Sequence, residues 1–259
     1  NKDLQQGDVT SYSGMGKDLK DHYEKTGEYA HWSNAMFGGM PANYTYPPPM
    51  ATIFNQLGLA ARLFLPIYHL GVVFLYLLGF YILLIALKCK PWLAVVGAVA
   101  YAFASYNFII IEAGHVNKGL AMATMAPVIG GIILTFQRKI LAGSLITLIA
   151  TGIHIGYNHQ QISYYLILMI ACMFVVYFIY AIREKTINQF LKASGILAIV
   201  AVLAVLPSTG KMLTIMDYTK ETMRGGAVLK NNPQGQQEGS GLEIDYAYQW
   251  SYGVGETWT

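Results

Sequence analysis

Charged residues are scarce in this chain. Of its 259 residues, 12% are charged and 54% are hydrophobic, whereas an average soluble domain has about 25% charged residues. Such a composition suits a chain whose main solvent is lipid. It therefore predicts an integral membrane protein that has membrane lipids as its surroundings.

The number of cysteines and the net positive charge are also low, and each argues against a class of protein. Cys89 stands in a Lys-flanked turn and Cys172 in the middle of an apolar stretch, so we expect no disulfide between them and a buried free thiol at Cys172. No Cys/His spacing is typical of a zinc site. A net charge of +3 without a basic run argues against nucleic acid as a partner.

Long apolar stretches, in contrast, are abundant. Six are long enough to cross, or nearly cross, a bilayer of about 30 Å, which predicts an all-α polytopic helical bundle with about six spans. The third contains Pro127 and the pair Gly130-Gly131 and could be kinked or broken. The last is short and could extend back through Lys192. The stretches are 67–87, 92–111, 119–136, 140–157, 162–182 and 193–207.

The turns between these stretches alternate in character. One set is short and basic, at 88–91, 137–139 and 183–185. The other is rich in hydrogen-bonding residues, at 112–118, at 158–161 and after residue 207. Because short loops rich in Lys and Arg stay in the cytoplasm, the second set is predicted to be extracytoplasmic.

This topology predicts three parts: 1–66 as an extracytoplasmic first loop with amphipathic and interfacial helices, 67–207 as the transmembrane bundle, and 208–259 as a second extracytoplasmic loop. The last is expected to be partly mobile, because 231–241 is of low complexity. Since residues 1–30 are polar and hold no targeting segment, we expect an upstream membrane anchor in a longer protein.

Within the first loop, the pattern of residues 17–25 predicts a surface helix that ends at Gly27. Residues 38–49 are rich in Gly and Pro and are expected to be loop. Residues 51–65 have apolar side chains at helical spacing and are expected to lie along the membrane interface.

Two candidate sites lie in this first loop. Asp8 could act as a general base towards a hydroxyl, or could bind a metal; alternatively it is a helix N-cap or a solvated loop acid. Trp32 and Asn34 belong to an aromatic and amide cluster that could stack on a sugar ring and hydrogen-bond its hydroxyls. The alternative is a packed loop with Trp32 anchored at the interface.

A third candidate site is at the outer end of the second stretch. Glu112, His115 and Lys118 fall within about two helical turns there, and Glu112 and His115 share a face if the helix continues. Ionisable groups at a membrane boundary are costly and often functional. Lys118, and His115 when protonated, could hold a phosphate. The alternative is a Glu112–Lys118 pair that neutralises itself.

The remaining candidates lie in the later polar turns. His154, His159 and Gln161 belong to a hairpin with more imidazole and amide groups than a turn needs, although two histidines also allow a metal. Arg224 could clamp a phosphate, or could belong to a hydrated loop. All these clusters are predicted to lie on one side of the membrane, which favours a protein that acts at its outer face.

At these residues the sequence resembles the YfhO family of bacterial membrane proteins, in the form found in Bacteroidetes. YfhO proteins are similar to glycosyltransferases of the GT-C class, integral membrane enzymes that use a lipid-phosphate-linked sugar on the extracytoplasmic side. The resemblance rests on 6–8, 32–34, 37–41, Glu112 to His115 with Lys118, Asn158-His159 with Gln161, 164–165 and 224–226.

The resemblance implies a GT-C-like fold and a multi-pass protein of the bacterial cytoplasmic (inner) membrane. The chain would then be a fragment lacking the first span and the C-terminal part. A sugar would pass from a polyprenyl-phosphate-linked donor to an acceptor hydroxyl of a glycan, polymer or protein that stays open. No cofactor is predicted, although a divalent metal remains open.

The resemblance also implies roles for the candidate residues. Asp8 would be the general base that deprotonates the acceptor hydroxyl. Cations would hold the lipid phosphate as it leaves, and other residues would line the sugar or acceptor pocket, with Glu112 counted among the substrate-binding groups. The cations are Lys118, His115 and Arg224, and the pocket residues are Trp32, Asn34, His159 and Gln161.

Two other functions stay open. A transporter or flippase would use Glu112 and His115 as a proton or substrate path, and a broken third helix would suit it. A non-catalytic scaffold for envelope assembly would leave Asp8 facing no cavity.

Overall fold

The computed structural model describes residues 6–36, 38–42, 52–63 and 68–220, together with six single positions near the end of the chain. Those positions are Asp245, Tyr248, Gln249, Ser251, Gly253 and Gly255. The chain divides into two compact units, Asn1–Pro207 and Ser208–Thr259, and each is described by itself.

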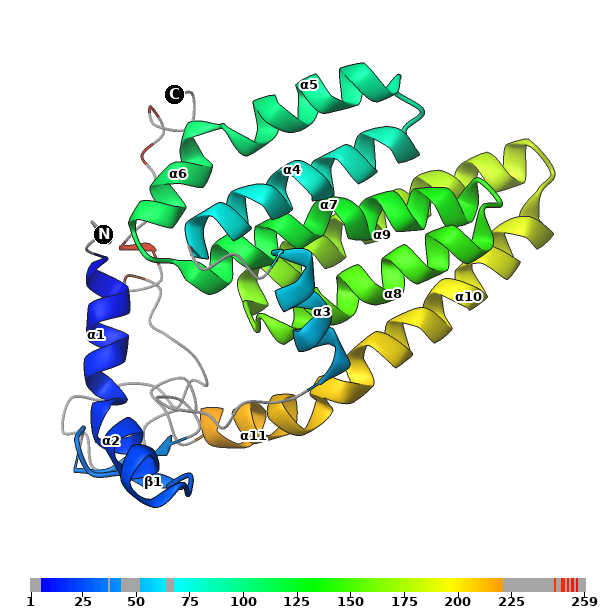
Figure 1. Cartoon of the computed structure of the whole chain (residues 1–259). Helices are drawn as coiled ribbons and strands as arrows, with labels where there is room; N and C mark the ends of the chain where they lie inside the picture. The colour runs from blue at the N-terminus through cyan, green and yellow to red at the C-terminus, as the bar shows by residue number, and fades with distance from the viewer. Residues whose placement is uncertain are drawn as a thin grey trace. The chain divides into compact units, whose positions relative to one another are not determined.

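The first unit is built mainly of apolar helices that run back and forth (Figure 1). They are α4 (Tyr68–Ala86), α5 (Pro91–Ala102), α6 (Ser105–Glu112), α7 (Val116–Phe136), α8 (Ile140–Gly156), α9 (Gln160–Arg183) and α10 (Ile187–Val205). In the part of the chain that is described, four helical stretches are long and apolar enough to cross a membrane, or five if the bent pair α5–α6 is one span. The fold thus fits an all-α membrane protein.

The predicted count of about six spans is not matched. The 17-residue α8 is shorter than the four candidate spans. The second predicted stretch is broken after Ala102, where α5 and α6 meet at 45°. Helix α10, which contains the sixth stretch, begins at Ile187, so the predicted extension of that stretch through Lys192 is confirmed.

The third stretch forms one unbroken helix, α7, which contains Pro127. Proline lacks the N–H that would bond to the carbonyl of Ala123, four residues earlier. Gly79 of α4 lies against that carbonyl, because a Cβ at Gly79 would be 2.6 Å from the Ala123 oxygen. The helix with the proline is therefore supported by a close neighbour, and the break lies instead in the second stretch.

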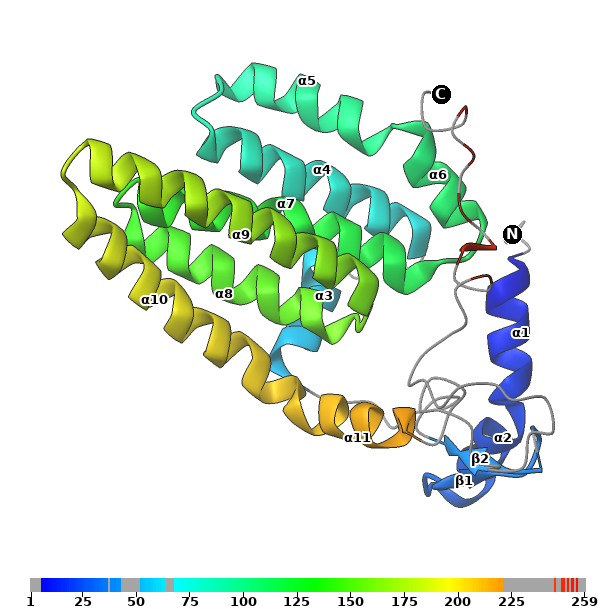
Figure 2. The same cartoon turned by 180° about the vertical axis from the view of Figure 1, so that it is seen from behind.

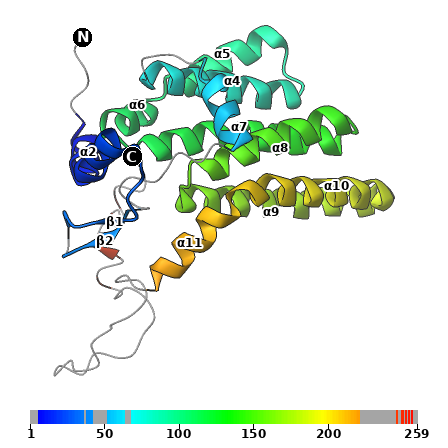
Figure 3. The same cartoon turned by 60° about the horizontal axis from the view of Figure 1, so that its bottom comes forward.

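Helix α7 is the centre of the bundle, with 72% of its candidate span buried. It meets α8 at two reciprocal contacts of small residues, a common way for helices to pack closely in membranes. A Cβ at Gly131 would lie 2.4 Å from Thr147 Oγ1, and a Cβ at Gly143 would lie 2.4 Å from Thr135 Oγ1. Helix α10 packs beside α8 and α9 (Figures 2 and 3).

The two ends of the bundle differ in how their helices stop. Helices α4, α7 and α9 are each followed, two residues after the last helical residue, by a cation with left-handed backbone, namely Lys88 (φ 62°), Arg138 (φ 67°) and Lys185 (φ 57°). We call this the basic end. At the opposite end of the bundle (Figure 1), α6 and α8 are each followed, two residues after the last helical residue, by a residue with left-handed backbone, Gly114 (φ 80°) or Asn158 (φ 53°). A histidine comes next in each case, His115 or His159. We call this the histidine end.

Two short helices and a hairpin precede the bundle. They are α1 (Gly7–Met15), α2 (Lys17–Thr26), β1 (Trp32–Ser33) and β2 (Met40–Pro41). The predicted surface helix at 17–25 is confirmed, with Gly27 in left-handed conformation at its end (φ 75°). The expectation of loop at 38–49 is wrong at Met40–Pro41, which pairs antiparallel with β1; residues 43–49 lie outside the described residues.

A further helix, α3 (Ile53–Ala61), packs across α8. Glycines on α8 allow the approach, since a Cβ at Gly152 would lie 2.4 Å from the ring of Phe54 and a Cβ at Gly156 would lie 2.7 Å from Asn55 Oδ1. The helix predicted for 51–65 is therefore present, and one side of it contacts the bundle.

The cysteines are free. Cys172 is exposed on α9 and not buried as expected, because only 11% of the candidate span in α9 is buried against its neighbours. An apolar run marks a membrane-facing helix as readily as a core helix.

In the second unit, α11 (Thr209–Thr219) occupies the start of the segment expected to be loop. The low-complexity stretch 231–241 and Arg224 lie outside the described residues.

Candidate functional site

The start of α1 is attached to the turn between α6 and α7. The side chain of Gln6 is buried and its amide donates a hydrogen bond to the carbonyl oxygen of Ile111. Gly114, in the same turn, has φ 80°, and a Cβ there would lie 3.0 Å from Cβ of Gln6 and 3.2 Å from Cγ2 of Val9. Glycine is thus required both by its backbone conformation and by the close approach of α1.

This attachment brings Asp8 to His115. Asp8 lies in the first turn of α1, and His115 is the residue before α7. Asp8 Oδ2 and His115 Nδ1 are 3.3 Å apart, and the two side chains are 65% and 48% exposed. The contact is an ion pair when the imidazole is protonated. Two candidates from distant parts of the sequence therefore meet at the histidine end.

Lys118 lies in the first turn of α7, on the same helix that His115 precedes. Its Nζ is 5.4 Å from the centre of the Tyr106 ring on α6, within range of a cation–π contact. Of the described carboxylates, none forms an ion pair with Lys118, so the alternative Glu112–Lys118 pair is absent.

Glu112 is placed differently from expectation. Helix α6 ends at Glu112 and Gly114 turns the chain before α7 begins, so the helix does not continue from Glu112 to His115. Glu112 and His115 therefore do not lie on a shared face of one helix. The side chain of Glu112 is exposed.

His159 stands at the start of α9 and caps it, since its Nδ1 accepts a hydrogen bond from the Ile162 N–H at 3.4 Å. Partial burial lowers the pKa of the His159 imidazole, and the positive charges of Lys118 and His115 lower this pKa further. Lys118 and His115 therefore act electrostatically on His159.

Beneath this surface lies a buried polar junction centred on His154 of α8, which is 2% exposed. Its Nδ1 is 3.1 Å from the Ala121 carbonyl and 2.9 Å from Thr124 Oγ1, and its Nε2 is 3.0 Å from Ser163 Oγ. Because a carbonyl only accepts, we assign the proton to Nδ1. Ser163 Oγ is also 3.2 Å from the carbonyl of His159.

The His154 junction ties α7, α8 and α9 together directly below His159. The sequence prediction placed His154 in the polar hairpin but did not assign it to the site. The available signal was a set of polar residues inside apolar stretches, Thr124, His154 and Ser163, but their contact depends on how the three helices pack.

Among the described contacts, none joins the other candidates in the first two-thirds of the chain to Asp8, His115, Lys118 or His159. Gln161 is exposed and donates a hydrogen bond to Tyr165 Oη at 2.8 Å. Trp32 and Asn34 are exposed and belong to the β1–β2 hairpin, which is joined to α2 by the bond from Ser33 Oγ to Asp18 Oδ2 at 2.8 Å. Figure 1 places this hairpin at the far end of α1 from the histidine end.

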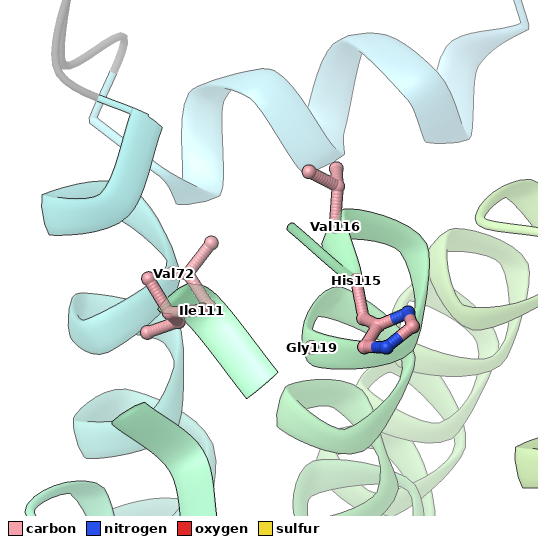
Figure 4. Close-up of a pocket in the computed structure, with 5 residues that line it drawn as sticks. All are labelled: Val72, Ile111, His115, Val116 and Gly119. Atoms are coloured by element: carbon pink, nitrogen blue, oxygen red, sulfur yellow. The ribbon is translucent and has the colours of Figure 1, made fainter. Parts of the chain in front are cut away.

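A small pocket opens beside His115 (Figure 4). Its lining is apolar apart from the imidazole, and it has room for little more than one water molecule. A sugar does not fit inside it. The lining residues are Val72, Ile111, His115, Val116 and Gly119.

Over the described residues, no group of three or more His, Cys, Asp and Glu side chains is arranged to hold a metal ion. The chain matches no known family model, no curated protein and no solved structure. The resemblance to the YfhO family therefore stays a prediction from the sequence.

Proposed function

We propose that this chain belongs to a membrane glycosyltransferase that moves a sugar from a polyprenyl-phosphate-linked donor to an acceptor hydroxyl. The observation that carries the proposal is the contact of Asp8 with His115, 3.3 Å apart, next to Lys118. An acid that can accept a proton and cations that can hold a leaving phosphate thus lie together at one end of a set of apolar helices.

In the proposed reaction Asp8 takes the proton of the acceptor hydroxyl as a general base. The hydroxyl oxygen forms a bond to C1 of the sugar, and the bond between C1 and the phosphate oxygen breaks. The electron pair of that bond leaves with the phosphate, whose charge Lys118 and protonated His115 stabilise. Arg224 is retained as a further phosphate ligand on the basis of the family resemblance.

The remaining roles follow the same resemblance. Gln161 is proposed to contact the sugar or the acceptor. Trp32 and Asn34, at the far end of α1 from Asp8 (Figure 1), are proposed to contact a part of the acceptor away from the reacting hydroxyl. We further propose that the histidine end faces the outside of the bacterial cytoplasmic membrane, since Lys and Arg of the basic end favour the cytoplasm.

The test is sugar transfer by the purified protein from a polyprenyl-phosphate sugar. Asp8→Asn removes the base and keeps the shape, and we expect it to lower the turnover rate by about 10²- to 10⁴-fold. Glu24→Gln is the matched control, because Glu24 is exposed on α2 and contacts only Lys20 among the described ion pairs. Equal rates for the wild type and Asp8→Asn would show that Asp8 is not the base.

A transporter or flippase is the second candidate, and one observation favours it. The bent pair α5–α6 interrupts an apolar stretch next to the histidine end, and interrupted helices are frequent at transporter binding sites. Movement of a labelled polyprenyl-phosphate sugar across vesicles, without transfer to any acceptor, would support this candidate over the enzyme.

A further inference from the structure

Side chains that can carry a positive charge gather at the histidine end, next to the carboxylates of Asp8 and Glu112. His115 and Lys118 stand at the beginning of α7, and His159 stands at the beginning of α9. Within the described part of the chain, Asp8 is the one carboxylate in ion-pair contact with any of the three. A cluster with several cationic groups and one bound carboxylate has capacity for a further anion.

The electrostatics point the same way. Lys118 and His115 both disfavour the charged form of the His159 imidazole, so each of them repels His159 when that imidazole is protonated. A phosphate has several acceptor oxygens on one small centre and can bond to more than one cation at once. Its binding would turn this mutual repulsion into attraction.

The carboxylate of Asp8 already occupies part of that space. Its Oδ2 lies 3.3 Å from His115 Nδ1. A phosphate that accepts a hydrogen bond from this nitrogen would therefore have to displace Asp8. The pair is largely exposed, so the contact is weak enough to be exchanged.

We propose that His115, Lys118 and His159 form the phosphate subsite of the donor, and that the phosphate displaces Asp8 from His115. This inference rests on the proposed transferase function and assigns His159 to the phosphate and not to the sugar pocket. It also gives Asp8 two states. Donor binding would release the Asp8 carboxylate from His115 and leave its oxygens free to accept the proton of the acceptor hydroxyl.

The experiment measures binding of a polyprenyl phosphate without a sugar, so that no transfer can occur. Affinity is determined at about pH 6, below the ordinary histidine pKa of about 6.5, for the wild type, Asp8→Asn, His115→Gln and the double variant. If Asp8 competes for His115, Asp8→Asn binds the polyprenyl phosphate about 1.5- to 5-fold more tightly than the wild type. In the His115→Gln background the same change has no effect.

Two controls keep the result interpretable. Glu24→Gln removes one negative charge elsewhere in the first loop and should leave the affinity unchanged. Thermal unfolding of each variant should match the wild type, because the Asp8–His115 pair is exposed. His159→Asn, which keeps a side chain suited to the cap of α9, should weaken binding.

Weaker or unchanged binding by Asp8→Asn would overturn competition. A gain that persists in the His115→Gln background would overturn it as well, since the gain would then come from general charge. If inorganic phosphate shows the pattern and the polyprenyl phosphate does not, the donor assignment is wrong. The proposed function fails separately, if the competition is observed but no sugar is transferred.

Discussion

The basic end and the histidine end solve the same structural problem in different ways. At both ends the chain must leave a helix and reverse direction through a residue with left-handed backbone. At the basic end that residue is Lys88, Arg138 or Lys185, whose positive charge is favourable beside the last carbonyls of a helix. At the histidine end Gly114 and Asn158 take this place, and the charged groups come afterwards, at the start of the next helix.

The difference shows what each end is arranged for. Lysine and arginine at the basic end stand just after the ends of their helices and provide a topology signal. Cations stand where a helix begins at both ends: Lys90 and Lys139 precede α5 and α8 at the basic end, and His115 precedes α7 at the histidine end. His115 differs in having a carboxylate oxygen, Asp8 Oδ2, 3.3 Å from its Nδ1.

The largest expected effect concerns the side of the membrane on which each end lies. In a background where Cys89 and Cys172 are replaced by Ser, Asn117→Cys at the histidine end should react with a membrane-impermeant thiol reagent added to intact cells. Lys139→Cys at the basic end should react only after the membrane is opened. Labelling of both positions, or the reverse pattern, would contradict the proposed orientation.

The next prediction concerns the glycine of the histidine end. Gly114→Ala should destabilise the attachment of α1 by about 1–3 kcal/mol, because it adds a Cβ at positive φ and against Gln6. Limited proteolysis of α1 and sugar transfer measure the loss. Gly195→Ala is the matched control, since a Cβ at Gly195 meets nothing within 4 Å. If both variants behave alike, the close contact of α1 with Gly114 is wrong.

The opposite substitution at the basic end should have the opposite sign. Arg138→Gly relieves the left-handed backbone of a non-glycine residue but removes its charge from the end of α7, so stability should rise by no more than about 1 kcal/mol. Thermal unfolding in detergent measures the change. A loss of several degrees would mean that Arg138 does more than end the helix, for example through its bond from Nε to Gln189 Oε1.

The smallest expected effect is on pH dependence. The pKa of His159 is lowered in the folded protein, so the unfolded chain binds more protons and stability is lost as the pH falls below the ordinary histidine value of about 6.5. His159→Asn should therefore lose less stability than the wild type between about pH 7 and 5. An equal loss in the two proteins, measured by thermal unfolding, would contradict this account of His159.

Much of the fold could be predicted from the sequence because the signals are local. The helix at 17–25 and its end at Gly27 follow from amphipathic spacing and one glycine, and the long apolar helices follow from composition. The break after Ala102 has no such signal, since neither proline nor glycine stands at Phe103 or Ala104. Pro127 suggested a break that is absent, because Gly79 lets α4 pack against the exposed carbonyl.

The site was predictable only in part, for a physical reason. Loop charges could assign His115 and His159 to one end of the bundle, but no sequence pattern shows that Gln6 bonds to the Ile111 carbonyl and brings Asp8 to His115. The buried junction of His154, Thr124 and Ser163 likewise depends on the packing of three helices. Such contacts between distant segments arise from the tertiary structure.

The most direct test examines both proposed roles of Asp8, as the general base and as the competitor of the phosphate for His115, in one variant. Sugar transfer and polyprenyl-phosphate binding are measured on the same preparation of Asp8→Asn and compared with the wild type. The account predicts that transfer is lost by about 10²-fold or more while binding is tighter. Transfer at the wild-type rate would contradict the central claim that Asp8 is the base held beside His115.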